Sequence, residues 1–149
     1  MSFTLDRRLA GDTIPVGDLE LTRVLLMDDA RWPWLILTPR RENIVEIFDL
    51  DAADRASLTE ETAATARIIA GVPATEKVNV GALGNIVRQF HMHIVGRRTG
   101  DPAWPGPVWG VGTRRRYESD VIGALRSEFA LKFGLCGLPF QPIGDAAAP

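Results

Sequence analysis

The chain has 149 residues, with 17 Lys and Arg against 19 Asp and Glu, so its formal net charge at pH 7 is −2. Apolar types make up 46% of the residues and charged types 24%, which is ordinary for a globular protein and too apolar for a disordered one. The balanced charge argues against a protein dedicated to binding nucleic acid. The length favours a single domain over residues 1–149.

Cysteine usage and the N-terminal sequence both indicate a reducing compartment. The single cysteine, Cys136, excludes an intramolecular disulfide, and we expect it to be a small buried residue. Charged residues at positions 6–8 interrupt the N-terminus before an apolar stretch of signal-peptide length can form. The strongest apolar run, residues 32–37, is too short to span a bilayer. We therefore predict a cytoplasmic protein that does not bind membranes.

The first part of the chain predicts an arm followed by a β-hairpin. Residues 1–17, punctuated by glycine and proline, are expected to form an N-terminal arm. A turn at residues 28–30 separates two strands, and the second strand runs over residues 34–38 and is closed by Pro39. In the first strand, apolar side chains are expected to share one face of a period-2 pattern: Leu19, Leu21, Leu25 and Met27.

The middle of the chain predicts one long helix and two strands. The helix spans residues 51–71, with an acidic start at Asp51 and a glycine stop at Gly71. A short strand follows over residues 77–80. After a link rich in glycine and asparagine, a longer strand runs over residues 86–95.

The C-terminal part predicts an irregular loop, a helix and a loose tail. The loop holds several prolines and glycines together with Trp104 and Trp109, which must pack against something. A helix begins after Ser119 and ends at Gly134, because apolar residues follow a helical spacing there. The order of elements is typical of an α+β fold with an antiparallel sheet, one long central helix and a C-terminal helix. We expect three parts within the domain: a core over about residues 19–98, a loop and helix over 99–138, and a loose tail over 139–149.

The longer strand carries the only two histidines of the chain, His91 and His93. Successive side chains of a strand alternate between its two faces, so the apolar residues at positions 90, 92 and 94 share a face that enters the core. Gln89, His91 and His93 share the other face. That face is predicted to present an amide and two imidazoles in a row.

Less specific explanations stay open for these polar groups. Two histidines on the polar face of an amphipathic strand can be ordinary surface residues. A metal site is the weaker alternative, because His-x-His supplies two ligands and Cys136 or an acid would have to complete the set without a recognisable spacing. We therefore predict no metal and no cofactor. The run Arg114-Arg115-Arg116 is expected to form a solvated rim.

The stretch Gln89-Phe90-His91-Met92-His93-Ile94-Val95-Gly96-Arg97 resembles the signature of the histidine-triad (HIT) family of nucleotide hydrolases and transferases. That signature reads His-φ-His-φ-His-φ-φ, where φ is apolar. The upstream order is similar too, with a hairpin ending in Pro39-Arg40-Arg41, a helix, and an Asn79-Val80-Gly81 turn before the signature strand. The resemblance covers about residues 19–98.

The resemblance implies an α+β HIT-like fold, a homodimer, and a nucleoside phosphate bound over the histidine strand without a catalytic metal. It assigns the nucleophile to His91, which attacks the α-phosphorus, expels the leaving group and forms a nucleotidyl-histidine that water resolves. A neutral imidazole is a good nucleophile near pH 7, provided that its other nitrogen donates to a fixed acceptor such as a backbone carbonyl. His93 and nearby donors would help to stabilise the charge on the phosphate.

Three positions depart from the family pattern. Gln89 stands at the first motif histidine, where an amide keeps hydrogen bonding but cannot titrate. Glu42 stands where many family members have a further histidine, and we expect Glu42 and Gln89 to form a compensating pair in the substrate site. Ile86 stands where the family commonly has the Ser or Thr that binds phosphate. Asn79 and Asn85 therefore become the predicted phosphate donors.

Two further positions near the site have expected roles. Arg97, at the end of the signature, is a predicted substrate-binding residue. Asp28 and Asp29 lie where family members often carry an acid for the ribose, but we expect them to serve the turn of the hairpin.

The sequence thus supports three candidate functions. The leading one is a metal-independent nucleotide hydrolase or nucleotidyl transferase with His91, His93 and Gln89 in its catalytic machinery. The alternative is a nucleotide-binding or sensing module with little or no activity. The third is an interaction protein whose loop around Trp104 and Trp109 binds a partner, although we expect that loop to pack on its own domain or on a dimer mate.

Overall fold

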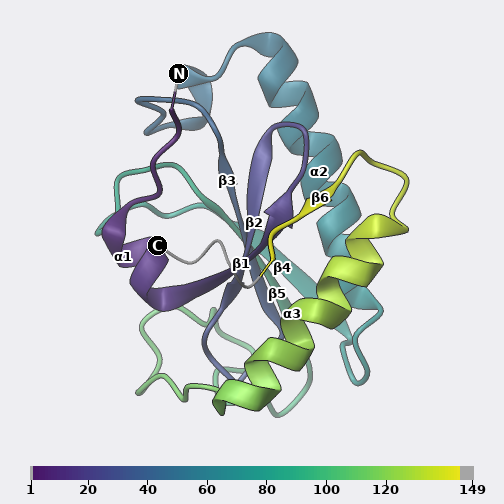
Figure 1. Ribbon diagram of the computed structural model, residues 1–149. Coiled ribbons are helices and arrows are strands. Elements are labelled where there is room, and N and C mark those ends of the chain that lie inside the picture. Colours follow the sequence, from purple (N-terminus) through teal and green to yellow (C-terminus); the bar gives the residue numbers. More distant parts are fainter. Residues whose placement is uncertain (1, 145–149) are drawn as a thin grey trace.

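The computed structural model describes residues 2–144 and contains one six-stranded antiparallel sheet with two helices packed on it (Figure 1). The helices are α1 (Arg7–Asp12), α2 (Ala52–Ala70) and α3 (Ser119–Gly134), with a 3-10 turn at Ile47–Asp49. In sheet order, the strands are β4 (Lys77–Gly81), β5 (Met92–Arg97), β3 (Trp34–Pro39), β2 (Thr22–Met27), β1 (Thr13–Asp18) and β6 (Gln141–Pro142). The predicted α+β fold with an antiparallel sheet, one long helix and a C-terminal helix is confirmed.

Helix α2 forms where its local signals predict it. The carboxylate of Asp51 caps its first turn by accepting a hydrogen bond from the backbone N–H of Asp54 at 2.8 Å, and Gly71 forms the C-cap. The buried carboxylate of Glu61 ties the helix to the sheet, because it accepts hydrogen bonds from the backbone N–H groups of Leu21 and Thr22.

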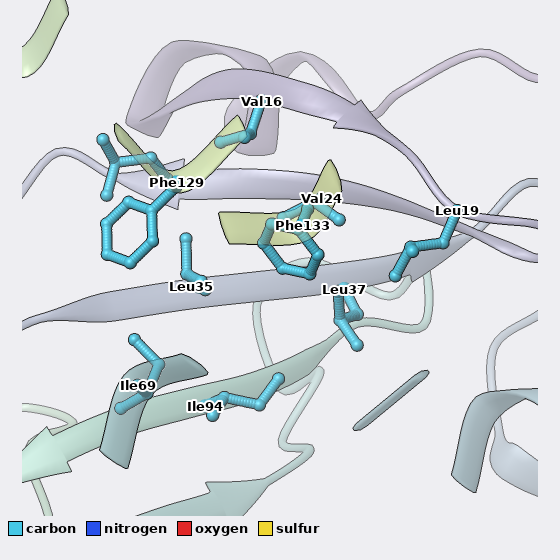
Figure 2. Packing of buried hydrophobic residues seen from close by; sticks show 10 residues of the cluster. Val16, Leu19, Val24, Leu35, Leu37, Ile69, Ile94, Phe129 and Phe133 are labelled. Carbon is cyan, nitrogen blue, oxygen red and sulfur yellow. The ribbon is translucent and has the colours of Figure 1, made fainter. Parts of the chain in front are cut away.

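The main core lies between one face of the sheet and helices α2 and α3. Ile69 of α2 lies beside Ile94 of β5, and Phe129 and Phe133 of α3 cover β1, β2 and β3 (Figure 2). The opposite face of the sheet buries a second cluster. It is covered by the N-terminal segment at Leu5 and by the loop after β5 at Ala103 and Trp109, rather than by a long helix. This cluster consists of Leu25, Trp32, Trp34, Ile36, Val95 and Val108.

The single-face pattern predicted for the first strand is wrong. Leu25 packs in the second cluster with Met27 against it, whereas Leu19 belongs to the main core. The reason is that Leu19 and Leu21 lie in the turn between β1, which ends at Asp18, and β2, which begins at Thr22, so the alternation does not run through them. Leu25 and Met27, which do lie in β2, share one face.

The predicted N-terminal arm over residues 1–17 is also wrong, because residues 7–18 form α1 and β1. The glycine and proline that suggested an arm lie at a β-bulge between Pro15 and Gly17, where a strand tolerates both residue types. The tail is not loose up to residue 144 either. Phe140 stacks on Phe133 with ring centroids 5.2 Å apart, and β6 pairs with β1. The remainder of the predicted tail lies outside the described residues.

The predicted strand over residues 86–95 is shorter and displaced. Strand β5 begins at Met92, and residues 82–91 form an irregular connection from β4. This connection is anchored at Phe90, whose backbone N–H donates to the carbonyl of Ile44 at 2.9 Å. The carbonyl of Phe90 accepts from the hydroxyl of Thr38 at 3.0 Å. The anchor fixes the backbone directly before the two histidines.

Arg115 and Arg116 are exposed, as predicted for a solvated rim, but the run also forms ion pairs. Arg114 pairs with Asp12 of α1, and Arg116 pairs with Asp28 of the hairpin turn, each at 2.9 Å. The carboxylate of Asp29 pairs with Arg31. The run therefore fastens the segment before α3 to the hairpin and to α1, and both turn aspartates have partners within the fold.

Among residues 2–144, no helix combines the length and the apolar character needed to cross a bilayer.

Candidate functional site

The two histidines lie in a pocket of about 600 Å³ on the face of the sheet opposite to α2 and α3. Three regions enclose it: helix α1, the connection before β5, and the segment around Trp109. Much of its lining is apolar, with a few polar groups beside the imidazoles. Its lining includes Arg8, Leu9, Met27, Trp34, Ile36, Leu83, Asn85, Ile86, His91, His93 and Trp109.

The backbone fixes the tautomer of His91. Its ring Nδ1 lies 2.7 Å from the carbonyl oxygen of Gln89, and the side chain is buried. A carbonyl oxygen has no proton to give, so Nδ1 must carry the proton and donate it. The other nitrogen, Nε2, is left with a free lone pair. His91 is therefore a nucleophile or a hydrogen-bond acceptor at Nε2.

His93 is held in the opposite tautomer by Trp34. The indole Nε1 of Trp34 lies 3.0 Å from Nδ1 of His93, and an indole N–H can only donate. Nδ1 of His93 therefore accepts, and the proton of its neutral ring lies on Nε2. Strand register supports this contact, because His93 on β5 lies opposite Ile36 on β3, two residues from Trp34.

His93 is neutral at physiological pH. Burial lowers its pKa to about 3, and repulsion from His91 acts in the same direction. The two rings meet edge to face with centroids 4.9 Å apart. The site therefore combines an acceptor nitrogen on His91 with a neutral donor nitrogen on His93.

A tryptophan from the loop after β5 closes the side of His93. The ring of Trp109 meets the imidazole with centroids 5.3 Å apart. It fits there because Gly81 on β4, which pairs with His93, has no side chain. A Cβ at Gly81 would lie 3.1 Å from the Trp109 ring. The prediction that this tryptophan packs on its own domain is confirmed.

Gln89 does not pair with Glu42 as predicted. Its side-chain oxygen accepts from the backbone N–H of Asp6 at 2.8 Å, and its amide nitrogen donates to the carbonyl of Thr4 at 2.9 Å. Glu42 is exposed and does not line the pocket. Both partners lie more than eighty positions away, in the segment predicted as an arm, so no local pattern indicates this contact.

Arg97 and Asn79 are also turned away from the pocket. Arg97 is only 2% exposed and forms a two-pronged ion pair with Asp101 at 2.7 and 2.9 Å. Its remaining terminal nitrogen donates to the side chain of Asn79 at 2.8 Å. Burial raises the pKa of Asp101, but hydrogen bonds from Arg97 and from the backbone outweigh it and hold that pKa well below its usual range. This pair holds the loop after β5 and does not face a substrate.

Of the predicted phosphate donors, only Asn85 lines the pocket. Cys136 packs against the main core, on the other side of the sheet from the histidines, so it cannot join them as a metal ligand. Within residues 2–144, no group of three or more Cys, His, Asp or Glu side chains is arranged to hold a metal ion.

Sequence reasoning missed three residues of the site: Arg8, Leu9 and Trp34. Trp34 lay in the predicted second strand, but its contact with His93 depends on the pairing of β3 with β5 across 59 positions. No sequence pattern predicts α1 either, because it has only six residues and includes a glycine, which disfavours a helix.

Comparison with known proteins identifies the family and similar solved structures. The family model described as HIT domain matches residues 10–100. A solved histidine triad protein from Bradyrhizobium japonicum is 43% identical, with a TM-score of 0.85 over 89% of this chain and 98% of that chain. One from Sinorhizobium meliloti is 48% identical, with a TM-score of 0.81 over 89% and 96% of the two chains. A third, from Marinobacter aquaeolei, is 38% identical, with a TM-score of 0.87 over 92% and 100%.

A search of curated proteins gives no match. The family match spans more than half of the chain, and the three solved structures align over nearly their whole length. The fold is accordingly HIT-like, and the chain belongs to the HIT domain family.

Proposed function

We propose that the chain is a nucleotide hydrolase or nucleotidyl transferase that works through a nucleotidyl-histidine at His91. The observation that carries this proposal is the hydrogen bond from Nδ1 of His91 to the carbonyl of Gln89, which leaves the lone pair of Nε2 available in the pocket. Membership of a family that generally acts on nucleotides supports the substrate class.

The proposed reaction has two steps. The lone pair of Nε2 of His91 attacks the α-phosphorus, the bond from phosphorus to the leaving group breaks, and the leaving group departs with that electron pair. The Nε2–H of His93 donates a hydrogen bond to the developing negative charge. Water, or an acceptor alcohol in a transfer, then attacks the phosphorus and loses a proton. The phosphorus–nitrogen bond breaks and returns the lone pair to His91.

The pocket suits a nucleoside phosphate in size and lining. Its volume of about 600 Å³ lies in the range of small-ligand sites. Apolar side chains offer a surface for a base or a ribose, and Asn85 offers an amide donor for the phosphate. Gln89, at the first motif position, contributes its backbone carbonyl to His91 and its side chain to the N-terminal segment.

The test is trapping of the covalent intermediate. Wild-type protein and His91→Ala are incubated with nucleoside phosphoramidates, aminoacyl-adenylates and dinucleoside polyphosphates, quenched, and analysed by intact-mass and peptide mass spectrometry. We expect a nucleotidyl adduct on the peptide containing His91, and loss of turnover in His91→Ala. Cys136→Ser, on the other side of the sheet, is the matched control and should keep turnover. Unchanged turnover in His91→Ala eliminates the mechanism.

A nucleotide-binding or sensing module remains the second candidate. The observation that favours it is the amide at the first motif position, whose side chain is committed to the N-terminal segment. Calorimetry that shows nucleotide binding to wild type, together with turnover absent from both wild type and His91→Ala, would support this candidate over the enzyme.

We also propose a cytoplasmic location and a homodimer. Strand β4 is an edge of the sheet, and Val80 on it is 48% exposed, so a second copy can extend the sheet across a two-fold axis. Sedimentation equilibrium should give twice the chain mass, and Val80→Arg should shift it towards the monomer. A monomer at all concentrations of wild type contradicts the dimer.

A further inference from the structure

The N-terminal segment forms one wall of the histidine pocket, and Gln89 holds it in place. Its side chain bonds Thr4 and Asp6, which lie 85 and 83 positions away in sequence. Leu9 is buried and lines the pocket. Residues that precede the first strand therefore belong to the site.

An amide suits this contact better than an imidazole does. The carbonyl of Thr4 and the N–H of Asp6 flank Leu5, and both meet the side chain of Gln89. A glutamine amide presents one donor and one acceptor side by side and can meet both groups at once. The two nitrogens of an imidazole point in divergent directions, so a histidine here could meet only one of them.

The segment brings one cation to the pocket. Among the described lining residues, Arg8 is the only lysine or arginine. Its Nη1 donates to the backbone carbonyl of Ile86 at 2.9 Å, so the side chain reaches from α1 to the connection before β5. Arg97 lies outside the pocket in its buried pair with Asp101. Asp12 also lines the pocket, and its carboxylate is paired with Arg114.

A phosphate in this pocket therefore has one strong source of positive charge. A nucleoside 5′-monophosphate, the product of the proposed hydrolysis, carries a charge of about −1.5 to −2 at pH 7. The imidazole of His93 is neutral because burial lowers its pKa to about 3, and the amide of Asn85 is also neutral. A guanidinium supplies five N–H donors in a planar fork that matches phosphate oxygens.

We propose that Arg8 binds the phosphate of the substrate, and that Gln89 is a positioning residue which holds the segment carrying Arg8. The proposal rests on the proposed function for the identity of the ligand. It explains why a glutamine at the first motif position is compatible with a working site, since the glutamine acts on the pocket wall rather than on the substrate.

The first experiment separates phosphate binding from nucleoside binding. Calorimetry measures the affinity of wild type, Arg8→Gln and Arg7→Gln for the four nucleoside 5′-monophosphates and for the matching nucleosides. We expect Arg8→Gln to weaken monophosphate binding by roughly tenfold or more and to leave nucleoside binding unchanged. Arg7 is exposed, as Arg8 is, but does not line the pocket, so Arg7→Gln is the control and should match wild type. Wild-type monophosphate affinity in Arg8→Gln overturns the proposal.

The second experiment tests the positioning role. In Gln89→Leu, hydrogen exchange of the amides of residues 4–10 should speed up, and KM for a phosphate substrate should rise more than kcat falls. Arg8→Gln should raise KM without the change in exchange. Unchanged exchange in Gln89→Leu, or a loss confined to kcat, overturns the assignment of Gln89.

Failure of this proposal can be told apart from failure of the proposed function. If wild type binds none of the monophosphates, the substrate class is wrong, and the exchange measurement still decides whether Gln89 holds the segment. If wild type binds a monophosphate and Arg8→Gln binds it equally well, only the role of Arg8 is wrong.

Discussion

Replacing His93 with asparagine should remove part of the acid sensitivity of the fold. His93 is buried, and its pKa in the folded protein is lowered to about 3, mainly by burial. In the unfolded chain its pKa returns to about 6.5. Between these two values the unfolded state binds a proton that the folded state does not, so stability must fall as the pH falls through this window.

The size of the effect follows from the two pKa values. The penalty is negligible at pH 7 and grows by about 1.36 kcal/mol for each pH unit below the unfolded pKa. Between pH 7 and pH 4.5, His93 should therefore cost the wild type roughly 2.5 kcal/mol of unfolding free energy. An asparagine cannot titrate and offers a carbonyl oxygen in place of Nδ1 as the acceptor for Trp34.

The assay is urea unfolding of wild type and His93→Asn at pH 7 and at pH 4.5, followed by tryptophan fluorescence and circular dichroism. The other titrating groups are common to both proteins, so they largely cancel when the two pH differences are subtracted. We expect wild type to lose roughly 2.5 kcal/mol more than the variant does. Equal losses in the two proteins would refute the assignment of His93 as a buried neutral imidazole.

Three further substitutions test other contacts. Asp101→Asn should destabilise the fold by about 3–5 kcal/mol, because it leaves the charge of Arg97 buried without its partner; urea unfolding measures it, and a loss below about 1 kcal/mol would contradict a structural pair. Trp34→Phe should leave His93 in a mixture of tautomers and lower turnover roughly two- to tenfold; ¹⁵N spectra of the imidazoles report the tautomer, and a single Nε2–H form in the variant would show that the indole does not set it. Gly17→Ala should lower the melting temperature, because its Cβ would collide with the ring of Phe140. An unchanged value would mean that the segment carrying Phe140 moves aside without cost.

Local signals in the sequence were sufficient to predict features that depend on contacts between residues close in sequence. Asp51 and Gly71 bound α2 as the capping pattern predicts, since both act within one turn of the helix. Alternation placed His91 and His93 on one side of the chain even though only His93 lies within the strand. The backbone acceptor for His91 comes from Gln89, two residues away, so this contact too is local in sequence.

The rest of the site depends on contacts that no local pattern encodes. Trp34 reaches His93 only after β3 and β5 have paired, and Gln89 meets the N-terminal segment only in the finished fold. Arg97 shows the opposite error. It stands beside the motif and was predicted to bind the substrate. In the structure it forms a buried ion pair with Asp101, four residues further along the chain.

The contacts of Gln89 with the N-terminal segment also determine which region of the protein unfolds first on heating. They join positions more than eighty residues apart through two hydrogen bonds, whereas the sheet beneath is held by continuous ladders and a buried core. Local opening favours the regions with the fewest buried contacts. On gentle heating the pocket wall should therefore detach while the sheet is intact. The proposed activity would then decline at a lower temperature than the melting transition of the core.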